Sequence, residues 1–149
     1  MANPTRTFSG SYPTHPQVAV GAVVFKEDEI LLVLRGKPPS KNLWSIPGGS
    51  VKLGETLQQA VEREIGEETG LTITAREPIY TFDVVERDEE GRIRFHYVIV
   101  DLAADYVRGE PRPGDDAIDA RWVSPEDAKN LEVSPATANL LNNRFGFEI

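Results

Sequence analysis

The alternation of apolar and polar residues divides the chain into short strands and helices. Two apolar runs rich in β-branched residues, Val18–Phe25 and Ile30–Arg35, are separated by four charged residues, which predicts a β-hairpin. Two longer runs, Leu71–Val85 and Arg92–Leu102, predict a second strand pair joined through a charged turn. Shorter strands are predicted at Leu43–Ile46 and Ala120–Val123.

Three segments carry helix signals. Glu55–Thr69 contains no proline, is rich in helix formers and is followed by Gly70, which suits the position after a helix end. Ser124-Pro125 and Ser134-Pro135 each place a capping serine before a first-turn proline, so helices are predicted to start there, the second continuing to Asn142. Strands around a central helix, with further helices at the end, predict an α/β fold with a mixed sheet covered on both faces.

Length and composition indicate a single domain. A chain of 149 residues with 40% hydrophobic content can bury one sizeable core. The proline-rich residues 1–16 are predicted to form an irregular N-terminal arm, and residues 17–149 the domain. The lack of cysteine excludes disulfides, thiolate metal ligands and cysteine nucleophiles. No run has the length of a signal peptide core or a membrane span, so a cytoplasmic protein without a membrane partner is expected.

The net charge of -8 argues against a nucleic-acid polymer as partner. Affinity for a phosphate backbone comes largely from lysine and arginine side chains that neutralise it. An acidic protein that handles phosphates therefore needs a cation to bridge the two.

Acidic residues of the predicted central helix fall on its buried side. At about 100° per residue, Glu64 and Glu68 lie inside the apolar stripe and Glu67 lies at its edge. Like charges at this spacing repel, and burying each costs on the order of several kcal/mol without compensation. A divalent cation such as magnesium, which prefers oxygen ligands, supplies that compensation; a solvated acidic face is the alternative. The apolar members of the stripe are Leu57, Ala60, Val61 and Ile65.

The segment that contains these acids has a defined spacing. From Gly49 the chain reads GSVKLGETLQQAVEREIGEETGL, which matches G-x5-E-x7-R-E-U-x-E-E-x-G-U, with U aliphatic, at every defined position. That pattern is the Nudix box, and the chain therefore resembles the Nudix hydrolase family. The resemblance extends from about Val18 to Val123. The matching positions are Gly49, Glu55, Arg63, Glu64, Ile65, Glu67, Glu68, Gly70 and Leu71.

The resemblance implies an α/β/α sandwich that hydrolyses the diphosphate linkage of a nucleoside diphosphate derivative, a small-molecule nucleotide. It implies Mg²⁺ as cofactor, with Mn²⁺ as an alternative. Glu64, Glu67 and Glu68 are implied as metal ligands or as the group that positions the attacking water, and the carbonyl of Gly48 as a further ligand. The implied supporting residues are Glu55 and Arg63.

These implied roles agree with the chemistry of the residues. Arg63 precedes Glu67 by four positions, so its guanidinium can hold that carboxylate through charge-assisted hydrogen bonds. Cations held by the glutamates would acidify a water and neutralise charge on the phosphate oxygens. Glycine at Gly48 and Gly49 lets the backbone approach the metal without an intervening side chain.

Several candidate site residues lie outside the box. Many family members add an acidic residue from a loop near the last strand, for which Asp116 is the first candidate here and Asp115 the second, with a plain surface turn as the alternative. Glu86 is a weaker candidate for the same role. Arg35 either reaches a substrate phosphate or forms a surface salt bridge. For His96, within a predicted strand, a structural role is favoured over contact with the substrate.

The aromatic residues are interpreted as core. Trp44 is expected to pack under the box. For Phe82, Phe95 and Tyr97, core packing is the first interpretation and a base-stacking pocket the second.

The resemblance favours ADP-ribose as substrate, cleaved to AMP and ribose 5-phosphate, because the strand segments look most like the bacterial ADP-ribose pyrophosphatase group. The proline that one ADP-ribose group carries about sixteen positions beyond the box is absent, however, and Glu86, Arg87 and Asp88 occupy that region. A nucleoside triphosphate pyrophosphatase is therefore the alternative, and a non-catalytic nucleotide-binding module the third. Homodimers are common in the ADP-ribose group, so the resemblance allows a homodimer, although no interface is identified.

Overall fold

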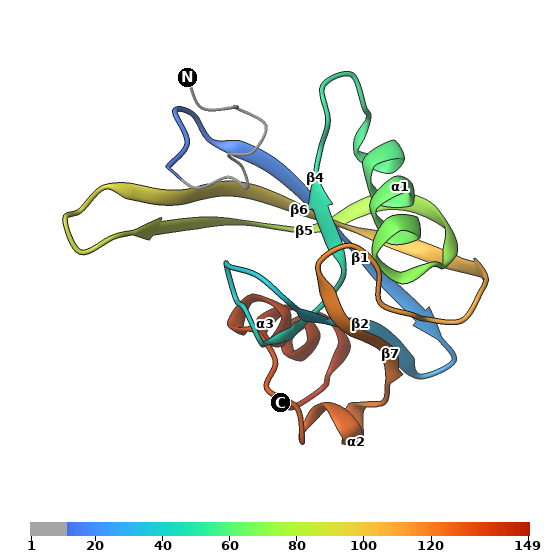
Figure 1. The fold of residues 1–149 in the computed structure, drawn as a ribbon. Helices are drawn as coiled ribbons and strands as arrows, with labels where there is room; N and C mark the ends of the chain where they lie inside the picture. The colour runs from blue at the N-terminus through green and yellow to red at the C-terminus, as the bar shows by residue number, and fades with distance from the viewer. Residues whose placement is uncertain (1–11) are drawn as a thin grey trace.

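The computed structural model describes residues 12–149, which form a seven-stranded mixed sheet with helices on both faces (Figure 1). The sheet order is β3-β2-β1-β6-β5, with β4 paired to β1 and β7 paired to β2. Most of the arm predicted at residues 1–16 lies outside the described residues. The strands are β1 (Gln17–Lys26), β2 (Glu29–Arg35), β3 (Trp44–Ser45), β4 (Gly48–Ser50), β5 (Thr72–Arg87), β6 (Ile93–Arg108) and β7 (Ala117–Val123).

The hairpin predicted at the start of the domain is confirmed, but its strands stay paired only beside the turn. Phe25 pairs with Ile30 and Lys26 with Glu29. Farther from the turn, β4 pairs antiparallel with β1 and β3 pairs antiparallel with β2. On its other edge β1 pairs in parallel with β6, and on its other edge β2 pairs antiparallel with β7. The separation of β1 from β2 therefore makes room between them for two short strands from the segment that follows β2.

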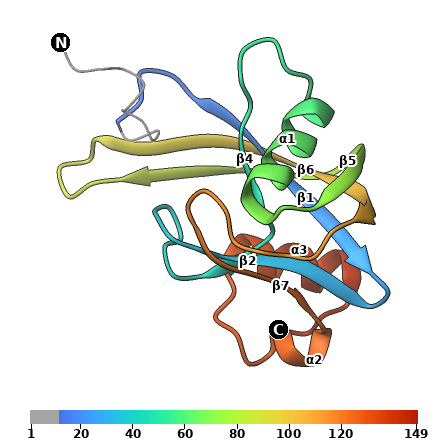
Figure 2. The ribbon, with the colours of Figure 1, turned by 45° about the vertical axis from the view of Figure 1, so that its right-hand side comes forward.

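The second predicted strand pair is also confirmed, and both strands are longer than expected. β5 and β6 have 16 residues each, and their turn-side halves project beyond the rest of the domain (Figures 1 and 2). The pairing continues past the predicted end of the second strand, with Thr74 opposite Asp105. Register shifts on both sides of Pro78 accommodate this residue, which has no N–H to donate to the ladder.

Within residues 12–149 the chain forms three helices, α1 (Leu57–Thr69), α2 (Pro125–Ala128) and α3 (Pro135–Phe145). α1 starts two residues later than predicted because Thr56 caps it, in a capping box with Gln59. It ends as predicted at Gly70, whose φ of 77° lies in the left-handed region. The serine caps of α2 and α3 are present as expected. No helix in residues 12–149 is long and apolar enough to cross a membrane.

Two apolar clusters lie on opposite faces of the sheet, which confirms the expected α/β/α sandwich. Alternate residues of a strand point to opposite faces, and in β1 Ala22 and Val24 contact the α1 cluster whereas Val23 contacts the α3 cluster. Trp44 is buried, as expected, but it belongs to the cluster with α3 rather than packing beneath α1. Phe95 is buried as well.

Candidate active site

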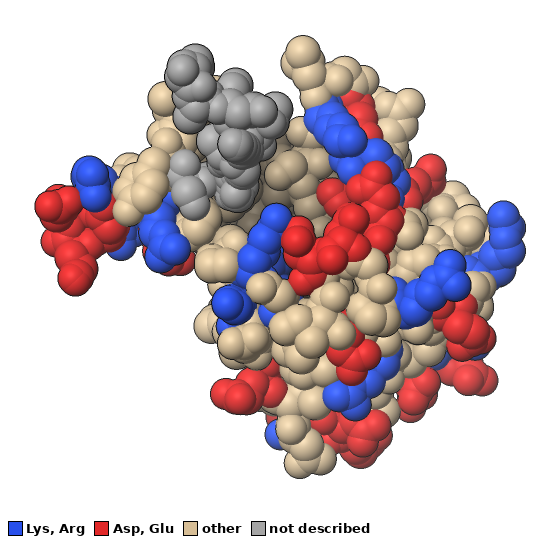
Figure 3. Space-filling model, in the orientation of Figure 1, with Lys and Arg blue, Asp and Glu red and all other residues tan. Residues whose placement is uncertain are grey.

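The three box glutamates at the C-terminal half of α1 differ in burial. Glu68 is buried, at 9% exposure, while the side chain of Glu64 is 15% exposed and that of Glu67 is 43% exposed. This order follows the apolar stripe of the helix, because Glu64 and Glu68 point toward the sheet and Glu67 lies at the edge. Figure 3 shows acidic side chains gathered over α1, with basic side chains beside them.

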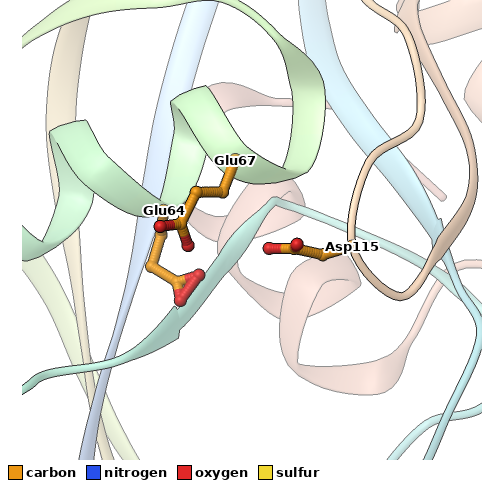
Figure 4. A group of neighbouring side chains, drawn as sticks. All are labelled: Glu64, Glu67 and Asp115. Atoms are coloured by element: carbon orange, nitrogen blue, oxygen red, sulfur yellow. The ribbon is translucent and has the colours of Figure 1, made fainter.

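Glu64 and Glu67 meet a carboxylate from a distant loop. One carboxylate oxygen from each of Glu64, Glu67 and Asp115 lies within 4.8 Å of the others, and Asp115 points toward α1 from the loop between β6 and β7 (Figure 4). That loop is attached to the end of α1, because the Gly114 N–H donates to the Glu68 carbonyl at 2.8 Å. A Cβ on Gly114 would lie 2.2 Å from the Glu67 carbonyl oxygen, so glycine permits this close contact.

The charges of this group are poorly compensated by the protein. Burial raises the pKa of Glu64, Arg63 opposes the shift, and the charges of Glu67 and Asp115 add to it. Burial also raises the pKa of Glu68 to about 7, against a hydrogen bond from the Gly48 N–H. Three converging carboxylates with only oxygen donors fit a hard divalent cation such as Mg²⁺ or Mn²⁺.

Arg63 ties the glutamates to the loop before α1. Its guanidinium donates two hydrogen bonds to Glu55, Nε to Oε2 at 2.6 Å and a terminal nitrogen to Oε1 at 2.9 Å. The same side chain lies 3.1 Å from Glu67 and 3.3 Å from Glu64, and donates to the Ser50 carbonyl at 3.0 Å. The hydrogen bonds from Arg63 lower the pKa of Glu55 to about 2. This geometry agrees with the supporting roles expected for Glu55 and Arg63.

The glycines of β4 make room for the glutamates. A Cβ on Gly49 would lie 2.2 Å from a carboxylate oxygen of Glu64. A Cβ on Gly48 would lie 2.0 Å from the Val20 carbonyl oxygen, and the Gly48 N–H donates to Glu68 at 2.9 Å. A side chain at Gly49 would therefore collide with the Glu64 carboxylate, whereas a side chain at Gly48 would collide with the backbone of β1. The carbonyl of Gly48 as a metal ligand stays a prediction.

A cavity of about 590 Å³ opens beside α1, between the loop that follows β2 and the face of β5 and β6. This volume lies in the range of small-molecule sites, roughly 300–1,000 Å³. Most of the site residues expected from the sequence line it. They are Arg35, Gly48, Glu64, Glu68, Glu86, Asp115 and Asp116.

The structure does not bring every candidate together. Asp115 rather than Asp116 joins the carboxylate cluster, whereas Asp116 forms an ion pair with Lys37 at 2.7 Å and both side chains are exposed. His96 pairs with Val85 in the β5–β6 ladder, on the face opposite that of Tyr97, and does not line the cavity. Arg35 lies close enough to Glu68 to oppose its raised pKa, although its Nε also donates to the Pro39 carbonyl at 2.6 Å.

Several cavity residues were missed or interpreted differently from the sequence. Phe82 and Tyr97, expected first as core, line the cavity and are only half-buried. Lys37 and Asp101 also line it, and neither was singled out. The signal that could have found Asp101 is its spacing, because Tyr97, Ile99 and Asp101 share one face of a strand at intervals of two.

Comparison with known proteins agrees with this geometry. The pattern of the NUDIX domain matches residues 15–143. An ADP-ribose pyrophosphatase of Methanocaldococcus jannaschii is 38% identical over 117 residues, which are 78% of this chain and 65% of that protein, so the chain spans slightly less than two thirds of that relative.

Solved structures give the same result. A MutT NUDIX hydrolase from Burkholderia pseudomallei has a TM-score of 0.69 and 29% identity over 87% of this chain and 98% of that one. A bifunctional NMN adenylyltransferase/ADP ribose pyrophosphatase from Francisella tularensis, complexed with AMP and a Mn ion, has a TM-score of 0.65 and 29% identity over 87% of this chain and 41% of that one. The box, the sandwich and these likenesses together show that the chain belongs to the Nudix hydrolase family.

Proposed function

We propose that the chain hydrolyses the diphosphate linkage of a nucleoside diphosphate derivative, with ADP-ribose as substrate and AMP and ribose 5-phosphate as products. The observation that carries the proposal is the cluster of Glu64, Glu67 and Asp115 at the edge of a cavity large enough for a nucleotide. Carboxylates and phosphates repel each other, so an acidic cluster binds a phosphate compound only through a cation that lies between them.

Glu64, Glu67 and Asp115 would hold a divalent cation, Mg²⁺ or Mn²⁺, with Asp116 and the Gly48 carbonyl as further candidates. When bound, such a cation neutralises phosphate charge and lowers the pKa of a bound water.

Glu68 is suited to accept the proton of the attacking water. It is the most buried of the three glutamates, the Gly48 N–H orients one of its oxygens, and its pKa is raised to about 7. A carboxylate held in place within reach of the attacking water can act as its general base. In the reaction, the water oxygen bonds to one phosphorus, the bond from that phosphorus to the bridging oxygen breaks, and Glu68 takes up the proton.

Arg35 and Lys37 supply positive charge to the lining of the cavity. Both are near enough to the Tyr97 hydroxyl to oppose the effect of burial, which raises its pKa. The phosphates would lie between these side chains and the acidic cluster. Glu86, at the outer part of the cavity, would contact the sugar or base, whereas the position of His96 argues for a structural role.

The choice of ADP-ribose is supported by two relatives, the Methanocaldococcus jannaschii protein and the Francisella tularensis protein, whose names include ADP-ribose pyrophosphatase activity. A nucleoside triphosphate pyrophosphatase is the alternative. The cytoplasmic location and the homodimer stay predictions.

Product analysis tests the proposal. The purified protein, with Mg²⁺ or Mn²⁺, is incubated with ADP-ribose, nucleoside triphosphates, dinucleoside polyphosphates, NADH and nucleotide sugars. We expect AMP release from ADP-ribose to exceed all other turnover. Preferred release of pyrophosphate from a triphosphate would transfer the protein to the alternative class, and no turnover with any compound would favour a binding module.

A further inference from the structure

Asp101 is a buried carboxyl group in the cavity wall and is not a member of the cluster of Glu64, Glu67 and Asp115. It lies on β6, is 3% exposed, and lines the same cavity as the glutamates. Burial raises its pKa to about 7, and no hydrogen bond or charge from residues 12–149 opposes this effect. An unpartnered buried carboxyl group destabilises a fold. Within residues 12–149 nothing donates a hydrogen bond to this carboxyl group, so a donor on a ligand bound in the cavity can pair with it.

The backbone around Asp101 is arranged to accommodate this side chain. Parallel pairing places Asp101 beside Gly21 of β1. A Cβ on Gly21 would lie 2.4 Å from Asp101 Oδ1 and 3.0 Å from the Ile46 side chain. Any larger residue at Gly21 would displace the carboxyl group, so the glycine keeps open the space that Asp101 occupies at the cavity wall.

The cavity residues that neighbour Asp101 along β6 and on the adjacent β5 are apolar and aromatic. Tyr97 and Ile99 share its face of β6, and Phe82 of β5 pairs with Ile99. Tyr97 lies roughly 13 Å from Asp101 along the strand, at about 3.3 Å per residue. The rings of Tyr97 and Phe82 offer flat surfaces for a base. A polar acceptor on an otherwise apolar and aromatic wall is the usual means by which a small-molecule site sets orientation.

We propose that Asp101 is a specificity-determining residue whose carboxyl group accepts a hydrogen bond from an N–H or O–H donor on the nucleoside portion of the substrate. This inference rests on the proposed function. The donor is either the base amino group or a ribose hydroxyl, and both present the same chemistry to the carboxyl oxygens. The contact fixes the nucleoside, while the phosphates are held near α1.

The test compares Asp101→Leu with the parent on ADP-ribose and on three analogues that each change one donor. These analogues carry hypoxanthine in place of adenine, or lack the 2′-hydroxyl, or lack the 3′-hydroxyl of the adenosine. The parent is expected to prefer ADP-ribose over one analogue by about 10–100-fold in kcat/KM, the loss typical for a hydrogen bond to a charged group. In Asp101→Leu that preference falls to about twofold or less, mainly through a higher KM for ADP-ribose.

Two further variants make the result specific. Asp105→Leu makes the same change on the same strand, at an exposed side chain that does not line the cavity, and is expected to keep the parent's preference. Asp101→Asn retains an acceptor in the same shape and is expected to give an intermediate preference. If Asp101→Leu does not fold, a drop of at least threefold in the preference of Asp101→Asn supports the inference, and an unchanged preference overturns it.

The melting temperature separates a ligand role from a structural one. Since leucine needs no hydrogen bond, Asp101→Leu at pH 8 should melt at or above the temperature of the parent. A lower melting temperature with an unchanged preference among the analogues would assign Asp101 to folding and overturn the inference. A parent that hydrolyses ADP-ribose without discriminating between the analogues overturns this inference alone, whereas a parent that hydrolyses no nucleotide overturns the proposed function together with it.

Discussion

Arg63 and Glu55 form a two-point ion pair that joins the middle of α1 to the loop before it, with nitrogen to oxygen distances of 2.6 and 2.9 Å. Paired parallel hydrogen bonds between a guanidinium and a carboxylate define orientation as well as distance. The pair leaves the remaining guanidinium edge to contact Glu67. The position of Glu67 thus depends, through Arg63, on Glu55, which lies eight residues before Arg63 in the chain.

The Glu55→Gln substitution should flatten the acid dependence of stability. The pKa of Glu55 is lowered from 4.5 to about 2, mainly by its hydrogen bonds from Arg63. A lowered pKa stabilises the fold above the ordinary value, and this contribution is lost as the pH falls from about 4.5 toward 2. Urea unfolding between pH 5 and 2.5 should therefore show a smaller loss for Glu55→Gln than for the parent. Glu89→Gln, at an exposed turn residue, should match the parent, and equal slopes in all three proteins would contradict the prediction.

Alanine substitutions at the two adjacent glycines of β4 should affect different properties, activity at Gly49 and stability at Gly48. Gly49→Ala would displace the flexible carboxylate of Glu64, so we expect an activity loss of about 10²-fold or more, as for a misplaced catalytic group, with little change in stability. Gly48→Ala would place Cβ against the Val20 backbone, which cannot move without disturbing β1. Thermal melting should show the larger destabilisation for Gly48→Ala. A Gly49→Ala protein with full activity would show that the position of Glu64 is not needed.

The two aspartates of the β6–β7 loop should differ in metal binding. Asp115→Asn should weaken Mn²⁺ or Mg²⁺ binding about tenfold or more, because it removes charge from the cluster of three carboxylates. Asparagine tolerates the left-handed backbone that Asp115 adopts, with φ of 49°, so the loop should be retained. Asp116→Asn should change affinity only slightly, because its carboxylate pairs with Lys37. Calorimetric titration of each variant measures the metal affinity. If both variants bind the metal as tightly as the parent, neither aspartate is the additional ligand.

Glu68→Gln should lower kcat by about 10²–10⁴-fold, the usual contribution of a general base, while the fold is preserved. The amide keeps an acceptor for the Gly48 N–H but cannot take up a proton at neutral pH. Glu62→Gln is the matched control, because it lies on the same helix and accepts a hydrogen bond from the Ala75 N–H rather than facing the cavity. Steady-state kinetics with saturating divalent cation measures both. Parent-like turnover by Glu68→Gln would show that another residue takes the proton.

The helix that bears the box glutamates could be predicted from the sequence alone. The order Arg63, Glu64, Glu67 and Glu68 has helical spacing, and a helix converts such spacing into neighbouring positions without help from the rest of the chain. The helix end at Gly70 and the serine caps of α2 and α3 are also local, so they were predicted correctly. The α/β/α architecture followed because both the helix stripe and the strands require apolar partners.

Which residues from outside α1 complete the site depends on tertiary contacts and could not be predicted from the sequence. The choice between Asp115 and Asp116 depends on how Gly114 docks against the end of α1, and the exclusion of His96 depends on strand register, where a shift of one residue exchanges the two faces. Asp101 reaches the cavity because β1 pairs in parallel with β6, which brings it beside Gly21. Parallel pairing joins segments about eighty residues apart and leaves no local sequence signal, so the residues it brings together become visible only in the folded chain.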